Sequence, residues 1–207
     1  MDTHETIRAR RAVKHYDPDF IIPEAHEKEL FDLARQSPTS FNMQNWRFVI
    51  VKDKAKRQQI RAAAWGQAQI TEASLLVILC ADTHAHKKDP ARYWHGAPQA
   101  AQDALIPKIT PFYEELPQRQ RDEAMRSVGI AAQTLMLAAK AFGYDSCPMI
   151  GFDSDEVGKI IDLPDDHVIG MIITIGKAIK PAWPKTGQLP DQEIILIDKF
   201  KHNEFFL

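Results

Sequence analysis

The sequence has little cysteine and no long apolar stretch. Its 207 residues include two cysteines, Cys80 in an apolar run and Cys147 before Pro148. Two isolated thiols do not make a disulfide framework, so we expect reduced thiols in a cytoplasmic protein, with a single bridge as the alternative. The longest apolar run, 75–81, is far shorter than the roughly 20 residues of a membrane-spanning helix. Charges at 8–14 stand where a signal peptide would be apolar, so we expect neither a membrane span nor a secretion signal.

Glycine is scarce, proline is not abundant, and the net charge is small. The chain has 9 Gly and 13 Pro, too few to indicate a long flexible linker, and 44% hydrophobic with 26% charged residues is typical of a globular protein. We therefore expect one domain over residues 1–207. A net charge of −2 argues against a general nucleic-acid-binding protein, which would be basic over a whole face.

Apolar spacing predicts more helix than strand. The expected helices are 7–15, 24–36, 54–64, 123–142 and 154–161. The expected strands are 46–51, 75–80 and 167–175, with 194–197 also strand-like, and 75–80 is apolar enough to be buried on both faces. Between them, 82–116 is divided by prolines and indicates short helices and loops, and 147–152 indicates a turn. The predicted class is α+β, a small sheet flanked by helices.

The expected helix 123–142 is apolar nearly all round. One sheet can cover only one side of such a helix, so we expect a second subunit to cover the other. The chain also ends in three apolar residues, 205–207, which need a groove if they are ordered. The helix therefore predicts an assembly of more than one subunit.

A basic cluster lies near the N-terminus. Arg8, Arg10, Arg11 and Lys14 fall within seven positions, interrupted by apolar residues that anchor the segment to the fold. Arginine forks of this kind bind phosphate. The alternative is an ordinary solvated helix end, because basic clusters commonly serve only solubility.

Three further segments carry polar groups suited to a ligand. The loop 37–46 is rich in hydroxyl and amide side chains, Gln67 and Gln69 place two amides before an expected strand, and the Pro/Gly-containing turn at 147–152 exposes backbone N–H groups. Taken singly, each segment has an ordinary structural explanation. The first is a connecting loop, the glutamines are a surface pair, and 147–152 is a tight corner. Taken together with the basic cluster, they supply what flavin mononucleotide (FMN) needs: cations for phosphate, amides and hydroxyls for the ribityl chain, and donors at the ring edge. His84 and His86 have no acidic or cysteine partner at ligand spacing, so we expect no metal site.

The order of these segments resembles the FMN-dependent nitroreductase family. It runs from Arg-Arg-Ala-Val-Lys through Ser-Pro-Thr-Ser-Phe-Asn-Met-Gln-Asn-Trp and Gln-Ala-Gln to Gly-Tyr-Asp-Ser-Cys-Pro-Met-Ile-Gly-Phe-Asp, and the resemblance covers nearly the whole chain. It implies a nitroreductase-like fold, a mainly antiparallel sheet within an intertwined homodimer, with FMN at two interface sites. It also implies that a C-terminal segment reaches over the partner.

The resemblance also implies which residues bind FMN. Arg10 and Lys14 would hold its phosphate and ring with Arg11 and the backbone at Ala12 beside them, and Lys14 and Gln69 would tune its reactivity. The other subunit would contribute the loop residues. The full implied set is Arg10, Arg11, Ala12, Lys14, Ser37, Pro38, Thr39, Ser40, Asn42, Gln67, Gln69, Pro148, Met149, Ile150, Gly151, Lys185 and Gln188.

Three positions depart from the family pattern. Ala12 stands where a phosphate-binding Ser is common, and Ile150 stands where some members have Glu, so the backbone alone would serve flavin N5. Gln188 stands where the family often has a phosphate-binding Arg, and Lys185 is a candidate replacement.

The implied function is an NAD(P)H-dependent nitroreductase or flavin reductase. Hydride would pass from NAD(P)H through flavin N5 to a nitroaromatic or quinone in two half-reactions, with no catalytic triad required. The alternatives are a same-fold flavoprotein that cleaves flavin or removes halogen, a flavin-holding protein without turnover, and a nucleic-acid-binding module led by residues 8–14. The physiological acceptor and the choice between NADH and NADPH are left open.

Overall fold

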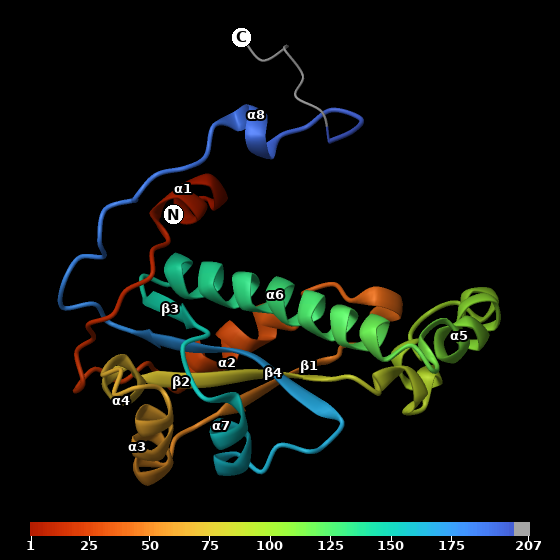
Figure 1. Ribbon diagram of the computed structural model, residues 1–207, viewed down its shortest axis with the longest axis horizontal. Helices are drawn as coiled ribbons and strands as arrows, with labels where there is room; N and C mark the ends of the chain where they lie inside the picture. The colour runs from red at the N-terminus through yellow and green to blue at the C-terminus, as the bar shows by residue number, and fades with distance from the viewer. Residues whose placement is uncertain (201–207) are drawn as a thin grey trace.

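A four-stranded antiparallel sheet forms the centre of the computed structural model, which describes residues 1–200 (Figure 1). Its strands are β1 (Trp46–Ile50), β2 (Leu75–Asp82), β3 (Asp145–Met149) and β4 (His167–Gly176), in the order β1-β2-β4-β3. Every residue of β2 is buried, which confirms the prediction of a strand covered on both faces.

Helices cover both faces of the sheet. Helices α2 (Glu24–Ala34) and α6 (Pro117–Ala141) pack on one face, where alternate β2 residues such as Val77 and Leu79 join their core. Helices α3 (Lys54–Ala63) and α7 (Ser154–Ile160) pack on the other, where Leu76 and Ile78 point. The period-two alternation of a strand thus divides the core into two layers. The predicted α+β class is confirmed.

The remaining helices lie around this framework. They are α1 (Thr3–Ala9), α4 (Gln69–Glu72), α5 (Gln99–Tyr113), α8 (Asp191–Ile194) and the short 3₁₀ turns η1 (Ser40–Asn42), η2 (Ala85–Lys87) and η3 (Pro90–Tyr93). None of the helices in residues 1–200 is both long and apolar enough to cross a membrane.

Helix α6 is the central helix of the fold. It begins at Pro117, six residues before the predicted start, because proline is well suited to the first helical turn, and it ends before Gly143, which adopts a φ of 82°. Small residues on its inner face, including Ala131 and Ala139, let it lie close to the sheet. Its outer face leaves Ile130 38% exposed, so the sheet covers only one side, as expected.

The N-terminal prediction was wrong in its second half. Helix α1 ends at Ala9, and Arg10 is already extended, with a φ of −61° and a ψ of 129°. The Val13 N–H donates to the Ser146 carbonyl at 3.0 Å, and Tyr16 bridges Ala178 beyond β4. Pairing and burial of Val13 and Tyr16 outweigh the local helical spacing, so the basic residues lie along an extended segment beside β3.

Three other local predictions were wrong. Within 82–116 the chain forms the 15-residue helix α5, which accommodates both Pro107 and Pro111. In the predicted turn 147–152, the first three residues belong to β3, because they pair with β4. At 194–197 the predicted strand does not form: Ile194 ends α8, and 195–197 belong to no helix or strand. The apolar ending 205–207 lies outside the described residues.

Candidate functional site at the β3 edge of the sheet

The outer edge of β3 has backbone groups available to a ligand. All five residues of β3 lie opposite residues of β4, as in Met149 opposite Ile172, and in an antiparallel ladder the backbone groups of alternate residues point away from the partner strand. Ser146 accordingly accepts from the Val13 N–H on the outer side. Pro148 has no N–H, which makes Ile150 the next donor on this edge. In the described chain no hydrogen bond from the Ile150 N–H is formed, and its side chain is 80% exposed.

The two predicted amides lie against the end of this strand. Gln67 Nε2 donates to the Gly151 carbonyl at 2.8 Å, and Gln69 Nε2 donates to Gln67 Oε1 at 3.0 Å. Gln69 is buried, so the alternative of a surface pair is wrong for this residue. Two segments separated by 84 positions in sequence therefore form one polar surface.

Gly151 lies close to an aromatic ring beside these amides. A Cβ added at Gly151 would lie 2.9 Å from Trp65 Cζ3 and 3.5 Å from Gln67 Nε2. The Trp65 ring is largely exposed, on a residue with a φ of 57°, followed by Gly66 at 76°. Backbone with positive φ at a non-glycine residue tends to occur in functional loops. Sequence reasoning missed Trp65, although an aromatic before glycine was a usable signal.

The basic segment brings positive charge to the same edge. Burial raises the pKa of the Cys147 thiol in β3, and the nearby charges of Lys14 and Arg10 partly oppose that rise. Neither Arg10, Arg11 nor Lys14 forms an ion pair within residues 1–200. Unpaired cations on an anchored segment are suited to an anionic ligand. Both cysteines are free, as expected, and both are buried, Cys147 in β3 rather than in the expected turn.

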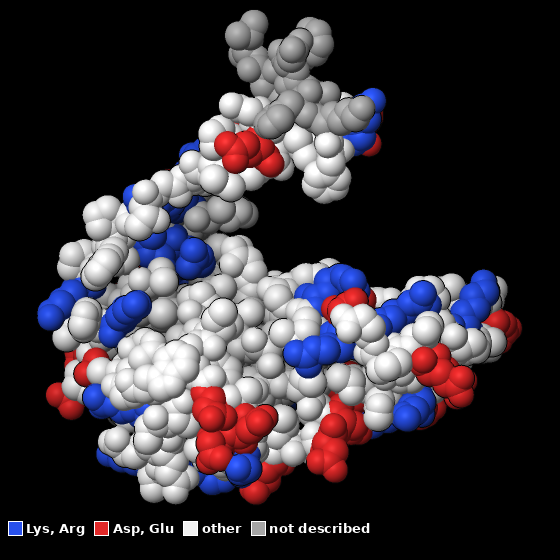
Figure 2. Space-filling model, in the orientation of Figure 1, with Lys and Arg blue, Asp and Glu red and all other residues white. Residues whose placement is uncertain are grey.

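A pocket of about 330 Å³ lies between the basic segment and the C-terminal arm, residues 177–200. Its lining includes Arg11, Lys14 and Lys185, whereas Arg10 and the exposed Gln188 lie outside it. Figure 2 shows Lys and Arg side chains gathered where the arm leaves the body, and the arm standing away from α6. Lys185, rather than Gln188, is the arm residue placed with the basic segment.

The loop residues lie elsewhere in the same chain. Ser37 Oγ donates to Thr134 Oγ1 at 3.0 Å, and the Ser40 N–H donates to Glu123 Oε1 at 3.2 Å, so both are attached to α6. Pro38 and Asn42 are exposed beside them. At about 1.5 Å rise per residue, the stretch of α6 from Glu123 to its end at Ala141 is about 27 Å long, and β3 lies beside that end (Figure 1). A single chain therefore holds Ser40 far from the basic segment, whereas Thr134, the partner of Ser37, is about 10 Å from the end of α6.

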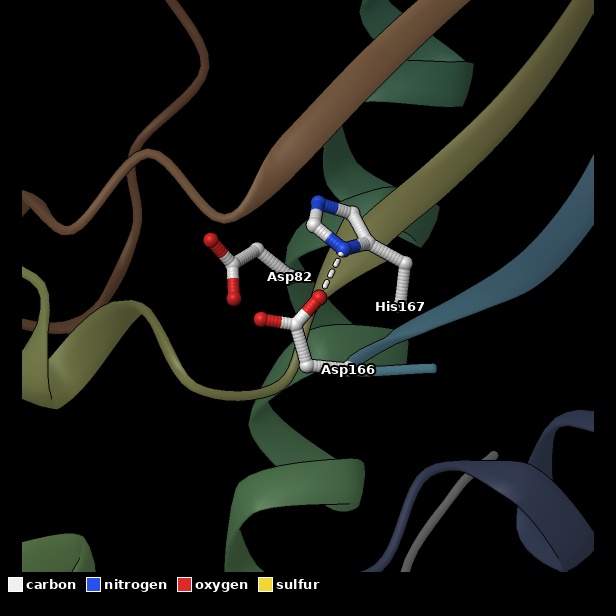
Figure 3. A group of neighbouring side chains, drawn as sticks. All are labelled: Asp82, Asp166 and His167. Carbon is white, nitrogen blue, oxygen red and sulfur yellow. Dashed lines mark hydrogen bonds and ion pairs between the residues drawn. The ribbon is translucent and has the colours of Figure 1, made fainter. Parts of the chain in front are cut away.

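A second polar group lies at the opposite end of β2 and β4. Asp82, Asp166 and His167 bring ligand atoms within 4.8 Å of one another, the spacing of a metal site (Figure 3). Cations already occupy it: Lys88 Nζ lies 2.8 Å from Asp82 and 2.6 Å from Asp166, and Arg47 lies 3.3 Å from Asp82. These contacts lower the pKa of Asp166 to about 2, chiefly through its hydrogen bond to Lys88. The group is an ion-pair network that ties 82–88 to β4.

The β3 edge therefore combines the features of a site for a planar anionic ligand. It offers unpaired cations, a pair of amides, an available backbone donor and exposed apolar side chains at Trp65 and Ile150. Such an arrangement can hold a phosphate at one end and a hydrogen-bonding ring at the other.

Comparisons with known proteins give the family of the chain. Residues 7–177 match the Nitroreductase family. Protein DrgA of Synechocystis sp. is 48% identical, over 96% of this chain and 97% of that protein, and YodC of Bacillus subtilis, assigned as an NAD(P)H nitroreductase, is 34% identical over 91% and 95%. A structure from Exiguobacterium sibiricum, assigned as a nitroreductase and solved with FMN, superposes with a TM-score of 0.85 at 27% identity, over 94% of this chain and 96% of that one. The family match spans most of the sequence, and the chain belongs to the nitroreductase family.

Proposed function

We propose that the protein is an FMN-dependent NAD(P)H oxidoreductase, with residues 1–207 forming one FMN-binding domain. When bound, FMN supplies a ring nitrogen, N5, that accepts hydride from NAD(P)H and passes it in a second half-reaction to a nitroaromatic or quinone. The observation that carries the proposal is the available Ile150 N–H on the outer edge of β3, flanked by the Gln67 amide and the unpaired cations. The FMN present in the Exiguobacterium structure supports the choice of cofactor.

The residues at this edge fit the two ends of FMN. Arg10 and Lys14, with Arg11 and the Ala12 backbone beside them, would hold the phosphate and the adjoining ring, and Lys185 would add a cation from the arm. Gln188 would lie further along the arm. The pocket between arm and basic segment places three cations around one cavity, which supports a phosphate there.

The ring end would be served by backbone and amides. The Ile150 N–H would donate to N5, in the turn that Pro148, Met149 and Gly151 shape. Gln67 and Gln69 would lie along the ribityl chain and the N1/O2 edge. Lys14 and Gln69 would place a cation and an amide where negative charge develops during reduction, which is how the chain would tune reactivity without a catalytic side chain.

We also propose a homodimer that completes each site. Ser40 lies toward the start of α6, far from the basic segment, and Ser37 lies against Thr134 further along the same helix. We assign Ser37, Pro38, Thr39, Ser40 and Asn42 to the partner's flavin. Exposed apolar side chains at Leu33 and Ile130 on the outer faces of α2 and α6 support burial against a second copy. The arm carries more, including Trp183 and Phe200.

The absorption spectrum of the purified protein tests this function. We expect a yellow protein that releases FMN rather than FAD on heating, because nothing in the sequence resembles the glycine-rich turn that binds a dinucleotide pyrophosphate. NADH or NADPH should bleach the flavin under anaerobic conditions, and a nitroaromatic or quinone should restore the colour. A colourless protein that takes up no FMN would contradict the proposal, and a flavin that neither nucleotide bleaches would leave a binding protein without turnover.

Light scattering tests the dimer. A flavin-loaded protein at micromolar concentration should have twice the mass of the chain, because one site draws on two chains. A monomer that retains FMN would show that residues 37–42 do not serve a partner's flavin.

A further inference from the structure

The loop at residues 39–44 has an unusual backbone. Phe41, Asn42 and Gln44 have φ values of 51°, 55° and 47°, a region that residues other than glycine rarely adopt. Such a conformation is strained and persists only where surrounding contacts impose it. The contacts that hold this loop are therefore informative about its purpose.

Part of the restraint comes from the segment before α5. The Asn42 amide donates to the Tyr93 carbonyl at 2.8 Å, and the Trp94 indole donates to the Phe41 carbonyl at 3.0 Å. These contacts hold the inner part of the loop, while Met43 lies buried beneath it.

The other contacts that restrain the loop are made to Ser40. Tyr113, at the end of α5, donates from its hydroxyl to Ser40 Oγ at 2.7 Å, and Glu123 of α6 accepts the Ser40 N–H at 3.2 Å. Both Tyr113 and Glu123 are buried, and Glu123 is itself held by Ser127 and Arg126. Burial raises the pKa of Tyr113, so its hydroxyl stays protonated and able to donate at neutral pH.

We infer that Tyr113 and Glu123 are positioning residues that set the 39–44 loop, through Ser40, for flavin bound at the partner's basic segment. The inference rests on the proposed function, which assigns the loop to that flavin. It also gives the 82–116 segment a role: α5 does not merely flank the site, because its last residue fixes one wall of it. Rigid placement of a binding group before the ligand arrives improves affinity by lowering the ordering cost.

Tyr113→Phe tests the inference, with Tyr93→Phe as the matched control. Tyr93 is also buried in this segment and its hydroxyl bonds the Ala85 carbonyl at 3.1 Å, but it makes no side-chain contact with Ser40. Both variants lose one hydroxyl and keep the ring. We expect Tyr113→Phe to weaken FMN binding by about tenfold, measured by flavin fluorescence on the stripped protein, and Tyr93→Phe to change it less than about twofold. Equal weakening in both would overturn the inference.

A double-mutant cycle with Ser40→Ala identifies the route. If Tyr113 acts through Ser40 Oγ, Tyr113→Phe should add less than about twofold to the loss in FMN affinity once Ser40 is Ala. Full additivity would contradict that route. Glu123→Gln keeps the acceptor for the Ser40 N–H and should bind FMN within about threefold of wild type, whereas Glu123→Ala should not.

Hydrogen exchange separates this inference from the proposed function. In the flavin-free protein, Tyr113→Phe should speed exchange of the 39–44 amides at least fivefold more than Tyr93→Phe does. If wild type binds no FMN, the proposed function fails and the flavin part of the inference fails with it, while exchange still decides the positioning. If wild type binds FMN and exchange is equal in the two variants, only the positioning is wrong.

Discussion

The two ends of the sheet differ in whether their cationic side chains are paired. At the β3 edge, Arg10, Arg11 and Lys14 have no carboxylate partner within the described chain. At the end where β2 meets the start of β4, Arg47 and Lys88 converge on Asp82, which is 1% exposed, and Lys88 also reaches Asp166. Cations lie beside a strand at both ends, but only those at the β3 edge are available to a ligand.

The difference separates binding from scaffolding. A paired buried charge is already satisfied and contributes to a fixed local structure, whereas an unpaired cation held on an anchored segment attracts an anion. Changes at the β3 edge should therefore alter flavin binding and reduction with little effect on stability. Changes at the opposite end should alter stability and leave flavin binding intact.

The largest expected effect is at Ile150. Ile150→Pro deletes the N–H proposed to serve N5 and restricts Met149, so reduction by NADPH should slow more than about a hundredfold. Ile150→Ala keeps the N–H and should stay within about tenfold of wild type, because only the exposed side chain changes. Stopped-flow reduction makes the comparison, and circular dichroism checks the fold. An inactive Ala variant, or a well-folded Pro variant with normal reduction, would rule out the N5 contact.

A smaller effect is expected from Arg10. Arg10→Ala should weaken FMN binding by about 1.5–3 kcal/mol, roughly ten- to hundredfold, by removing a charge-assisted phosphate contact. Arg8→Ala is the control, because Arg8 is an exposed residue in the last turn of α1. Fluorescence titration of the stripped protein measures both. Equal affinities in the two variants would place the phosphate elsewhere.

The third prediction compares two glycines, one near each end. A Cβ at Gly170 in β4 would lie 3.1 Å from Val128 Cβ in α6, where neither side can move freely, so Gly170→Ala should cost about 1–3 kcal/mol of stability. At Gly151 the obstructing atom belongs to the exposed Trp65 ring, so Gly151→Ala should cost less than about 0.5 kcal/mol but weaken FMN binding. Urea unfolding and flavin titration should give opposite rankings. The same ranking in both assays would break the distinction between the two ends.

The smallest expected effect is a loss of stability at acidic pH. The native pKa of Asp166, about 2, is below its usual 3.8, so the group stabilises the fold above about pH 4, and that stabilisation is lost as the pH falls from about 4 to about 2. Because Asp166 is partly exposed, the effect should be about 1 kcal/mol or less. Asp166→Asn should lower stability by this amount at pH 6, with the difference vanishing near pH 2. A difference that is the same in urea unfolding at both pH values would show that titration of Asp166 is not its source.

The sequence predicted the features that depend on local pattern. The apolar run of β2, most of α6 and the α+β class follow from periodicity and helix-ending signals that involve neighbouring residues. The association of Gln67 with the turn at Gly151 came only from the family resemblance, and the structure places these residues together. The assignment of all these residues to a flavin stays a prediction.

What could not be predicted depends on distant pairing. The hydrogen bond from Val13 to Ser146 joins segments 133 positions apart and draws the basic residues out of a helix. Likewise, the prolines of α5 indicated breaks, yet Ile109 and Tyr113 are buried in the packing of that segment and the helix continues through them. Tyr113 and Glu123 meet Ser40 only in the folded chain, and the one local signal was an acidic residue on the apolar side of α6.

Pro148 has a consequence for the behaviour of the protein in solution. An outermost strand with unpaired N–H groups is a template on which another chain can form a β-sheet, and aggregation begins at such strands. Here residues 11–13 cover the first part of β3, and Pro148 removes the next donor. One N–H remains, too few to align a foreign strand. The arrangement that leaves a donor for a small molecule thus also protects this edge of the sheet from pairing with another chain.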